Sequence, residues 1–178
     1  MHTYIAFLRG INVGGHKKVP MAQLRELLGK KGLKNVQTYI QSGNVIFQSK
    51  ETNNNILEGK IQKAIVGQFG FDVPVLVISP IELKKVYDDC PFPEAQKTNS
   101  YFMFLYDIPD QDLVKEISGI SYPNETFVIT KIAIYFHCSK GYGKAKFSNN
   151  FFEKRLKITA TARNYKTIVK LLSLSTEI

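Results

Sequence analysis

Four short segments contain arginines, lysines, asparagines and glycines whose types and spacing could bind an anion. The first is R-G-I-N-V-G-G-H-K-K at 9–18, which joins an apolar run to an expected helix. Glycines allow close backbone approach, and Val19 caps that helix poorly, so its first N–H groups are left for a phosphate. The spacing matches neither the P-loop nor the dinucleotide fingerprint, and a tight connection with solvated lysines explains it equally well. The residues expected to contact a ligand here are Arg9, Asn12, Gly14, Gly15, Lys17 and Lys18.

Two further segments combine glycine with polar or basic residues. Ser42 and Asn44 flank a glycine between two strand-like runs, where a turn is a sufficient explanation and ligand contact is the alternative. The segment K-G-Y-G-K-A-K-F at 140–147 fits the RNA-recognition pattern at its first four positions and its last. It carries Lys144 where that pattern has an aromatic residue, and it follows a strand as a loop. We therefore interpret it as a basic loop that contacts phosphate.

The fourth segment, A-R-N-Y-K-T at 162–167, begins the last expected helix. Asn164 is a natural N-cap, which explains its position without a ligand. Arg163 is expected just outside the helix N-terminus, where a cation opposes the helix dipole unless an anion is present. We therefore include both residues among the candidate ligand contacts.

Charge is distributed unevenly along the 178 residues, whose net charge is +9. Residues 1–48 carry a net charge of +6, residues 49–138 carry −4, and residues 139–178 carry +7. If the two ends meet, they form a positive face that attracts polyanions or phosphate-bearing ligands. The alternative is that these lysines only lie on helix surfaces that face solvent.

The sequence indicates neither a metal site nor a cofactor. Cys90, Cys138 and the three histidines have no ligand spacing. Phosphoryl or nucleotidyl transfer generally requires carboxylates that hold metal ions. The only carboxylate side chains in the two basic ends are those of Glu26, Glu153 and Glu177, which argues against an enzyme of that kind.

The apolar pattern of the first half predicts the element order βαββαβ. We expect a strand at 3–9, a helix at 20–31, strands at 36–40 and 45–47, a helix at 52–68 and a strand at 73–78. Pro74 cannot donate to a ladder, so the last strand begins late or lies at an edge. The capping box S-P-I-E at 79–82 predicts a further helix to about 89.

The same element order is expected again after a proline-rich linker at 90–99. We expect a strand at 100–106, a helix at 110–118, strands at 125–130 and 132–138, a helix at 148–156, a strand at 157–161 and a final helix at 164–174. No short sequence repeat is visible. The expected fold is α+β, with two ferredoxin-like (βαββαβ) antiparallel subdomains at 1–89 and 100–178 and a C-terminal helix.

Four motifs resemble the bacterial family called domain of unknown function 1697. They are R-G-I-N-V-G-G-H-K-K-V-P-M-A-Q-L-R, T-Y-I-Q-S-G-N-V-I-F, K-x-K-F-S-N-N-F-F-E-K-R-L and T-A-R-N-Y-K-T-I-V-K-L, which together span nearly the whole chain. The resemblance implies a cytoplasmic bacterial protein with ferredoxin-like subdomains. It places the family's characteristic polar positions on Arg9, Asn12, Ser42, Asn44, Arg163 and Asn164. Tyr165 stands where the family pattern has tryptophan, which keeps an aromatic ring. The resemblance implies no activity.

These observations favour a protein that binds a phosphate-bearing ligand, either a nucleotide or a nucleic acid, at a basic cleft. The first alternative is a phosphoryl- or nucleotidyl-transfer enzyme at the same cleft. The second is an interaction module that binds another protein through its acidic middle. The chain has no apolar run of ~20 residues and no leader sequence, so we expect a cytoplasmic protein without a membrane partner. The oligomeric state and the identity of the ligand stay open.

Overall fold

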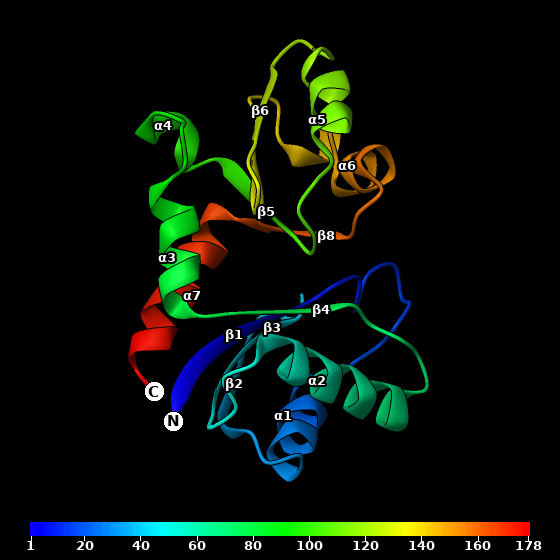
Figure 1. The fold of residues 1–178 in the computed structure, drawn as a ribbon, viewed down its shortest axis with the longest axis vertical. Coiled ribbons are helices and arrows are strands. Elements are labelled where there is room, and N and C mark those ends of the chain that lie inside the picture. Colours follow the sequence, from blue (N-terminus) through cyan, green and yellow to red (C-terminus); the bar gives the residue numbers. More distant parts are fainter. The chain divides into compact units, whose positions relative to one another are not determined.

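Two four-stranded antiparallel sheets organise the chain, in a computed structural model that describes all residues 1–178 (Figure 1). Seven α-helices accompany them, so the expected α+β class is confirmed. The chain divides into two units. The first unit comprises Met1–Lys84 and Lys170–Ile178, and the second comprises Lys85–Val169. The expected linker at 90–99 contains a short helix, α4 (Glu94–Lys97), and a boundary between independent domains there stays a prediction.

The first sheet has the strand order β2-β3-β1-β4. Its elements are β1 (His2–Leu8), α1 (Met21–Lys30), β2 (Lys34–Tyr39), β3 (Asn44–Ser49), α2 (Asn54–Phe69) and β4 (Val75–Ile78), followed by α3 (Pro80–Asp88). Pro74 has the expected consequence, since β4 begins after it and lies at an edge of the sheet. The capping box is also confirmed, because Ser79 N–H donates to Glu82 Oε2 at 2.7 Å and Glu82 N–H donates to Ser79 Oγ at 3.2 Å.

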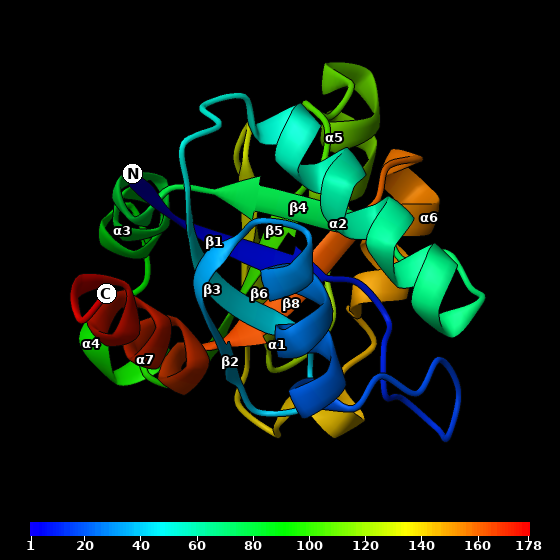
Figure 2. The same cartoon turned by 90° about the horizontal axis from the view of Figure 1, so that it is seen from below.

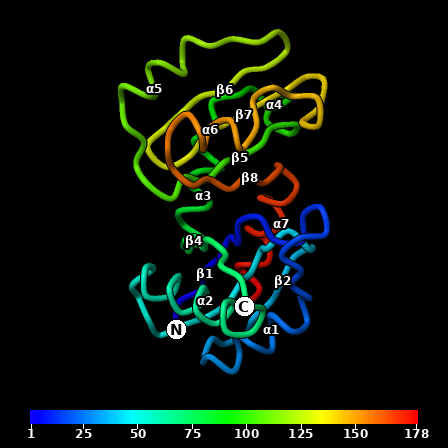
Figure 3. The backbone as a smooth tube through the Cα atoms, turned by 90° about the vertical axis from the view of Figure 1, so that its right-hand side faces the viewer, coloured from blue at the N-terminus to red at the C-terminus, as the bar shows by residue number.

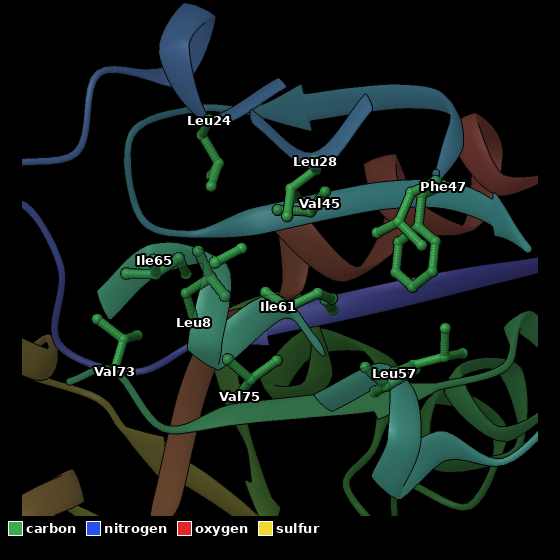
Figure 4. Packing of buried hydrophobic residues seen from close by; sticks show 14 of the residues in the cluster. Leu8, Leu24, Leu28, Val45, Phe47, Leu57, Ile61, Ile65, Val73 and Val75 are labelled. Carbon is green, nitrogen blue, oxygen red and sulfur yellow. The ribbon is translucent and has the colours of Figure 1, made fainter. Parts of the chain in front are cut away.

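Helices α1 and α2 cover one face of the first sheet (Figure 2). Leucines and isoleucines recur at helical spacing on both helices, so each presents an apolar stripe to the strands. Their buried side chains pack against those of β1, β3, β4 and the segment just before β4, as Figure 4 shows for Leu8, Leu24, Leu28, Val45, Phe47, Leu57, Ile61, Ile65, Val73 and Val75. Each such buried side chain stabilises the unit by roughly 1.5–3 kcal/mol. This core holds the ends of the strands in place.

The second sheet has the strand order β6-β7-β5-β8, which repeats the arrangement of the first. Its elements are β5 (Ser100–Leu105), α5 (Gln111–Ser118), β6 (Glu125–Ile129), β7 (Ala133–Cys138), the 3₁₀ turn η1 (Tyr142–Lys144), α6 (Asn149–Leu156), β8 (Ala160–Asn164) and α7 (Tyr165–Thr176). Helices α5 and α6 lie on the same side of these strands (Figure 3). The fully buried ring of Phe147 joins them to the sheet, with ring-centroid distances of 4.7 Å to Phe127 and 5.8 Å to Phe152.

The last strand of the second sheet was expected at 157–161, and this expectation is wrong by three residues. Helix α6 continues to Leu156, and Lys157 then adopts a left-handed conformation with φ of 55° as its C-cap. A residue in that conformation cannot extend a strand, so β8 begins only at Ala160. Arg163 and Asn164 therefore belong to this strand.

The two units share one hydrogen-bonded arrangement that we call the edge clamp. Asn54, the first residue of α2, donates from Nδ2 to the Val77 carbonyl at 3.1 Å, and Glu58 Oε1 accepts from Val77 N–H at 2.8 Å. In the second unit Asn149, the first residue of α6, donates to the Ala160 carbonyl at 2.8 Å. Glu153 Oε1 there accepts from Ala160 N–H at 2.9 Å.

Both edge clamps have the same sequence, N-N-x-x-E, at 54–58 and 149–153. The spacing of four places the amide and the carboxylate on neighbouring turns of one helix face. Together they satisfy the N–H and C=O of a single residue on the outer strand. This short internal repeat corrects the expectation that the sequence contains none, and the apolar pattern does not reveal it.

Candidate functional site

In the first unit, Asn12 anchors the loop at 9–18. Its Nδ2 donates to the carbonyls of Val19 at 3.1 Å and Gln41 at 2.9 Å, and its Oδ1 accepts from Val19 N–H at 2.8 Å. The backbone at Asn12 has a φ of 54°, a conformation that asparagine tolerates better than most residues. These contacts give Asn12 a structural function, and its contact with a ligand stays a prediction.

The tip of this loop is exposed. Gly14 and Gly15 have φ values of 56° and 78° and form a tight turn in which His16 N–H donates to the Val13 carbonyl at 3.0 Å. Lys17 Nζ donates to the Asp72 carbonyl at 2.6 Å, while Lys18 is exposed. Arg9 is half-buried directly after β1, and its N–H donates to the Pro74 carbonyl at 2.9 Å.

Ser42 and Asn44 close the turn between β2 and β3. Asn44 is fully buried, and its Nδ2 donates to the Tyr39 carbonyl and to Ser42 Oγ, both at 3.0 Å. Gly43 between them has a φ of +80°, and a Cβ there would lie 2.7 Å from Leu8 Cβ. Leu8 N–H donates to the Gly43 carbonyl at 2.8 Å. The observed contacts therefore account for this motif as a turn pressed against β1.

In the second unit, Arg163 and Asn164 have different environments. Arg163 is 7% exposed in β8, and its Nη1 donates to Thr161 Oγ1 at 2.7 Å and to the Ala162 carbonyl at 2.8 Å. The last helix begins at Tyr165, so Arg163 stands just outside its N-terminus as expected, and it also belongs to strand β8. Asn164 Oδ1 accepts from Thr167 N–H at 2.9 Å, which confirms Asn164 as the cap of α7.

An open cavity of about 590 Å³ lies at one end of the second sheet. The ends of β5, β7 and β8, the loop after β7 and the start of α7 meet there. The cavity is lined by Thr98, Asn99, Ser100, Tyr101, His137, Cys138, Ser139, Gly141, Tyr142, Asn164, Tyr165 and Lys166. The sequence named Asn164 among these residues as a ligand contact. Gly141, Tyr142, Tyr165 and Lys166 lie in the two segments at 140–147 and 162–167 that it singled out, and the other lining residues carry no motif signal.

Aromatic side chains form one wall of this cavity. The rings of Tyr101 and Tyr142 stack with their centroids 4.3 Å apart, and Tyr142 OH accepts from Asn149 N–H at 3.1 Å. Burial raises the pKa of Tyr101, and the neighbouring Tyr142 adds to this effect. Tyr101 therefore keeps its proton at neutral pH and remains a hydrogen-bond donor.

The basic loop at 140–147 is held in place by Glu125. The two carboxylate oxygens of this residue accept from Lys146 N–H and Phe147 N–H, each at 2.8 Å. Lys144 is exposed in the turn η1 beside the cavity wall. The segment forms a loop and a 3₁₀ turn, so it does not supply the strand that the RNA-recognition pattern requires.

The candidate residues thus fall into two groups that belong to different units. Arg9, Asn12, Gly14, Gly15, Lys17, Lys18, Ser42 and Asn44 are in the first, and Lys144, Arg163 and Asn164 are in the second. No group of three or more histidine, cysteine, aspartate or glutamate side chains is placed to hold a metal ion. None of the helices combines the length and apolar character needed to cross a bilayer.

Comparisons with known proteins agree with the fold. The chain is similar to the structure of conserved bacterial protein SP0830 from Streptococcus pneumoniae, with 25% sequence identity and a TM-score of 0.71. The similarity covers 97% of this chain and 98% of that one. No curated protein matches the chain. A family model described as protein of unknown function (DUF1697) matches residues 1–135, which is most of the chain, and the chain therefore belongs to that family.

Proposed function

We propose that the protein binds a phosphate-bearing ligand in the cavity of the second unit. The observation that carries this proposal is the composition of the cavity wall, which combines tyrosines with the start of α7 and Lys166 and contains no carboxylate. The N-terminus of a helix carries a partial positive charge that favours anions. Lys166 adds a full positive charge at the same end.

The aromatic wall favours a nucleotide over a bare phosphate. Tyr101, Tyr142 and Tyr165 all line the cavity, and aromatic rings are the side chains on which nucleobases stack. Ser139 and Asn164 supply polar groups between the rings and the lysine. A volume of about 590 Å³ is within the range typical of small-molecule sites. The first-unit motifs are not needed for this proposal.

Binding is favoured over phosphoryl transfer at this site. Phosphoryl-transfer enzymes position metal ions with carboxylates, and the lining residues include neither aspartate nor glutamate. The site is therefore proposed as a binding site.

A thermal-shift comparison of ligand classes tests the proposal. ATP, adenosine, tripolyphosphate and inorganic phosphate would each be added to the full chain. A nucleotide at about a hundred times its dissociation constant contributes ~2.7 kcal/mol, which raises the melting temperature by roughly 5–10 °C. We expect ATP to stabilise the chain more than adenosine or tripolyphosphate. Equal melting temperatures with and without all four ligands would contradict the proposal.

We also propose that both units are ferredoxin-like. The order of elements, strand–helix–strand–strand–helix–strand, occurs once in each unit. The strand orders β2-β3-β1-β4 and β6-β7-β5-β8 support this assignment, since both place the first and third strands at the centre. The shared edge clamp adds a further correspondence between the units.

A further inference from the structure

Tyr165 is the tyrosine of the cavity wall that begins helix α7. Its hydroxyl lies 3.3 Å from the hydroxyl of Tyr87 in helix α3, and the two form a hydrogen bond. The rings are tilted by 39°, with their centroids 5.9 Å apart. This hydrogen bond is the largest of the causes that raise the pKa of Tyr165, so Tyr165 keeps its proton at neutral pH. Tyr87, which does not line the cavity, therefore contacts a residue that does.

Tyr87 is itself held in place by two neighbours. Its ring stacks with that of Phe102 in β5, with an interplanar angle of 16° and centroids 6.4 Å apart. Phe102 is fully buried in the second sheet. The ammonium group of Lys97 lies 3.9 Å from the centroid of the Tyr87 ring, which is a close cation–π contact. Because a buried ring and a cation both contact it, the ring of Tyr87 holds its hydroxyl in one position.

These contacts connect two parts of the cavity wall. Lys97 is the last residue of α4 and immediately precedes the lining residues 98–101. Tyr165 belongs to the lining residues 164–166, which lead into α7. We call Lys97, Tyr87 and Tyr165 the aromatic bridge. It ties the segment after α4 to the N-terminal end of α7, which is the end that favours an anion.

We propose that Tyr87, with Lys97 over its ring, is a positioning residue for ligand binding, because it fixes Tyr165 in the cavity wall before the ligand arrives. This inference rests on the proposed function, since it concerns the same cavity and its nucleotide. A side chain that already has its bound conformation loses less conformational entropy on binding. The aromatic bridge therefore raises the affinity without adding a contact between Tyr87 and the ligand.

A double-mutant cycle with ATP as the probe tests this inference on the full chain. Tyr87→Phe and Tyr165→Phe each remove one hydroxyl and keep the ring. Tyr87→Phe should weaken ATP binding by about two- to tenfold, the effect of one lost hydrogen bond, and Tyr165→Phe at least as much. The double variant should bind no more weakly than Tyr165→Phe alone, because Tyr87 acts through Tyr165. Isothermal titration calorimetry measures the four affinities.

Substitutions of Lys97 test the cation–π contact. Lys97→Met keeps a long side chain and removes the charge, so it should weaken binding by about two- to fivefold, whereas Lys97→Arg keeps a cation and should bind as wild type does. The loss should be the same for adenosine, which carries no phosphate, because the effect passes through the Tyr87 ring. Lys131→Met removes an exposed charge elsewhere in the same unit and should change neither affinity.

A measurement on the free chain separates positioning from a general loss of stability. With ¹³C-labelled tyrosines, Tyr87→Phe should shift the ring resonances of Tyr165 and leave those of Tyr122, in the same unit, unchanged. Undiminished ATP binding by Tyr87→Phe, additive losses in the double variant, a Lys97→Met loss restricted to ATP, or unchanged Tyr165 resonances would overturn the inference and leave the proposed function in place. No ATP binding by wild type would contradict the proposed function and overturn the inference with it.

Discussion

Glu58 and Glu153 make the same contact in the two units, each accepting a hydrogen bond from the N–H of a residue on an outer strand. The oxygen–nitrogen distances are 2.8 Å to Val77 and 2.9 Å to Ala160. In both cases an asparagine four residues earlier in the same helix binds the carbonyl of that same outer-strand residue. The pair thereby occupies the outward N–H and C=O of that residue, which hinders pairing of the strand with another chain.

The edge clamp of the first unit predicts that two substitutions of Glu58 change the unfolding free energy by different amounts. Glu58→Ala leaves Val77 N–H without its partner and should cost about 1–3 kcal/mol of unfolding free energy. Glu58→Gln keeps an acceptor oxygen and removes a half-buried charge, so it should not lower the unfolding free energy at neutral pH. Urea denaturation of both variants beside wild type measures the difference, and equal losses would contradict the clamp.

The pH dependence of stability provides an independent prediction for the same residue. Burial raises the pKa of the Glu58 carboxyl, and the hydrogen bond from Val77 opposes this only in part. The folded state therefore holds this proton more tightly than the unfolded state does. Wild-type stability should fall as pH rises from the unfolded pKa through the folded one. Glu58→Gln should lack this part of the fall, which begins near the unfolded pKa of about 4.3, and an unchanged pH profile would count against it.

Gly43 and Gly70 form a matched pair that separates backbone strain from steric contact. Their φ values are +80° and +79°, but a Cβ on Gly43 would lie 2.7 Å from Leu8 Cβ, whereas nothing lies within 4 Å at Gly70. Gly70→Ala should cost roughly 1–2 kcal/mol for the left-handed backbone alone. Gly43→Ala should cost a further 1–3 kcal/mol, roughly, for the forced movement of β1. If thermal denaturation shows that Gly43→Ala and Gly70→Ala lose the same amount of stability, then Gly43 does not press against Leu8.

Removing the Glu125 carboxylate should loosen the basic loop beside the cavity. Glu125→Ala leaves Lys146 N–H and Phe147 N–H without their acceptors, so both amides should exchange faster with solvent by about tenfold or more. Glu94→Ala, a substitution on the exposed helix α4, is the control. Unchanged protection of the two amides in hydrogen-exchange NMR would show that Glu125 does not hold the loop.

Apolar periodicity predicted most of the elements because packing dominates their formation. The helix at 110–118 and the strand at 100–106 each lie within one or two residues of α5 and β5. The strand after α6 was misplaced because its start depends on the left-handed conformation of Lys157, which no apolar pattern encodes. The apolar pattern does not encode the edge clamp either, since its residues act through hydrogen bonds to backbone that is distant in sequence.

The candidate site was harder to predict than the fold. Asn12 and Asn44 stood out as polar residues beside glycines, and the structure shows both bound to backbone carbonyls. Tyr101 and His137 lie within strands, where they are indistinguishable in sequence from other alternating residues. Only the pairing register brings their strand ends beside Asn164.

The nucleic-acid form of the proposed ligand predicts a specific salt dependence. Lys166 lines the cavity of the second unit, and Lys140 and Lys144 lie next to the lining residues Gly141 and Tyr142. Three phosphate contacts on a single strand give a slope of about −2 for the logarithm of the binding constant against that of salt concentration. Fluorescence anisotropy with a labelled oligonucleotide measures this slope. A flat response would exclude nucleic acid and leave a small nucleotide as the ligand.

The most direct measurement of the central claim compares the affinity of ATP for wild type, Lys166→Gln and Lys170→Gln. Both lysines are exposed on α7, but only Lys166 lines the cavity. Loss of one charge-assisted contact should weaken binding by about 10- to 100-fold in Lys166→Gln, and Lys170→Gln should bind as wild type does. NMR shifts on titration should centre on residues 139–142 and 164–166. Equal affinities for all three proteins, or no binding by any of them, would contradict a phosphate site in this cavity.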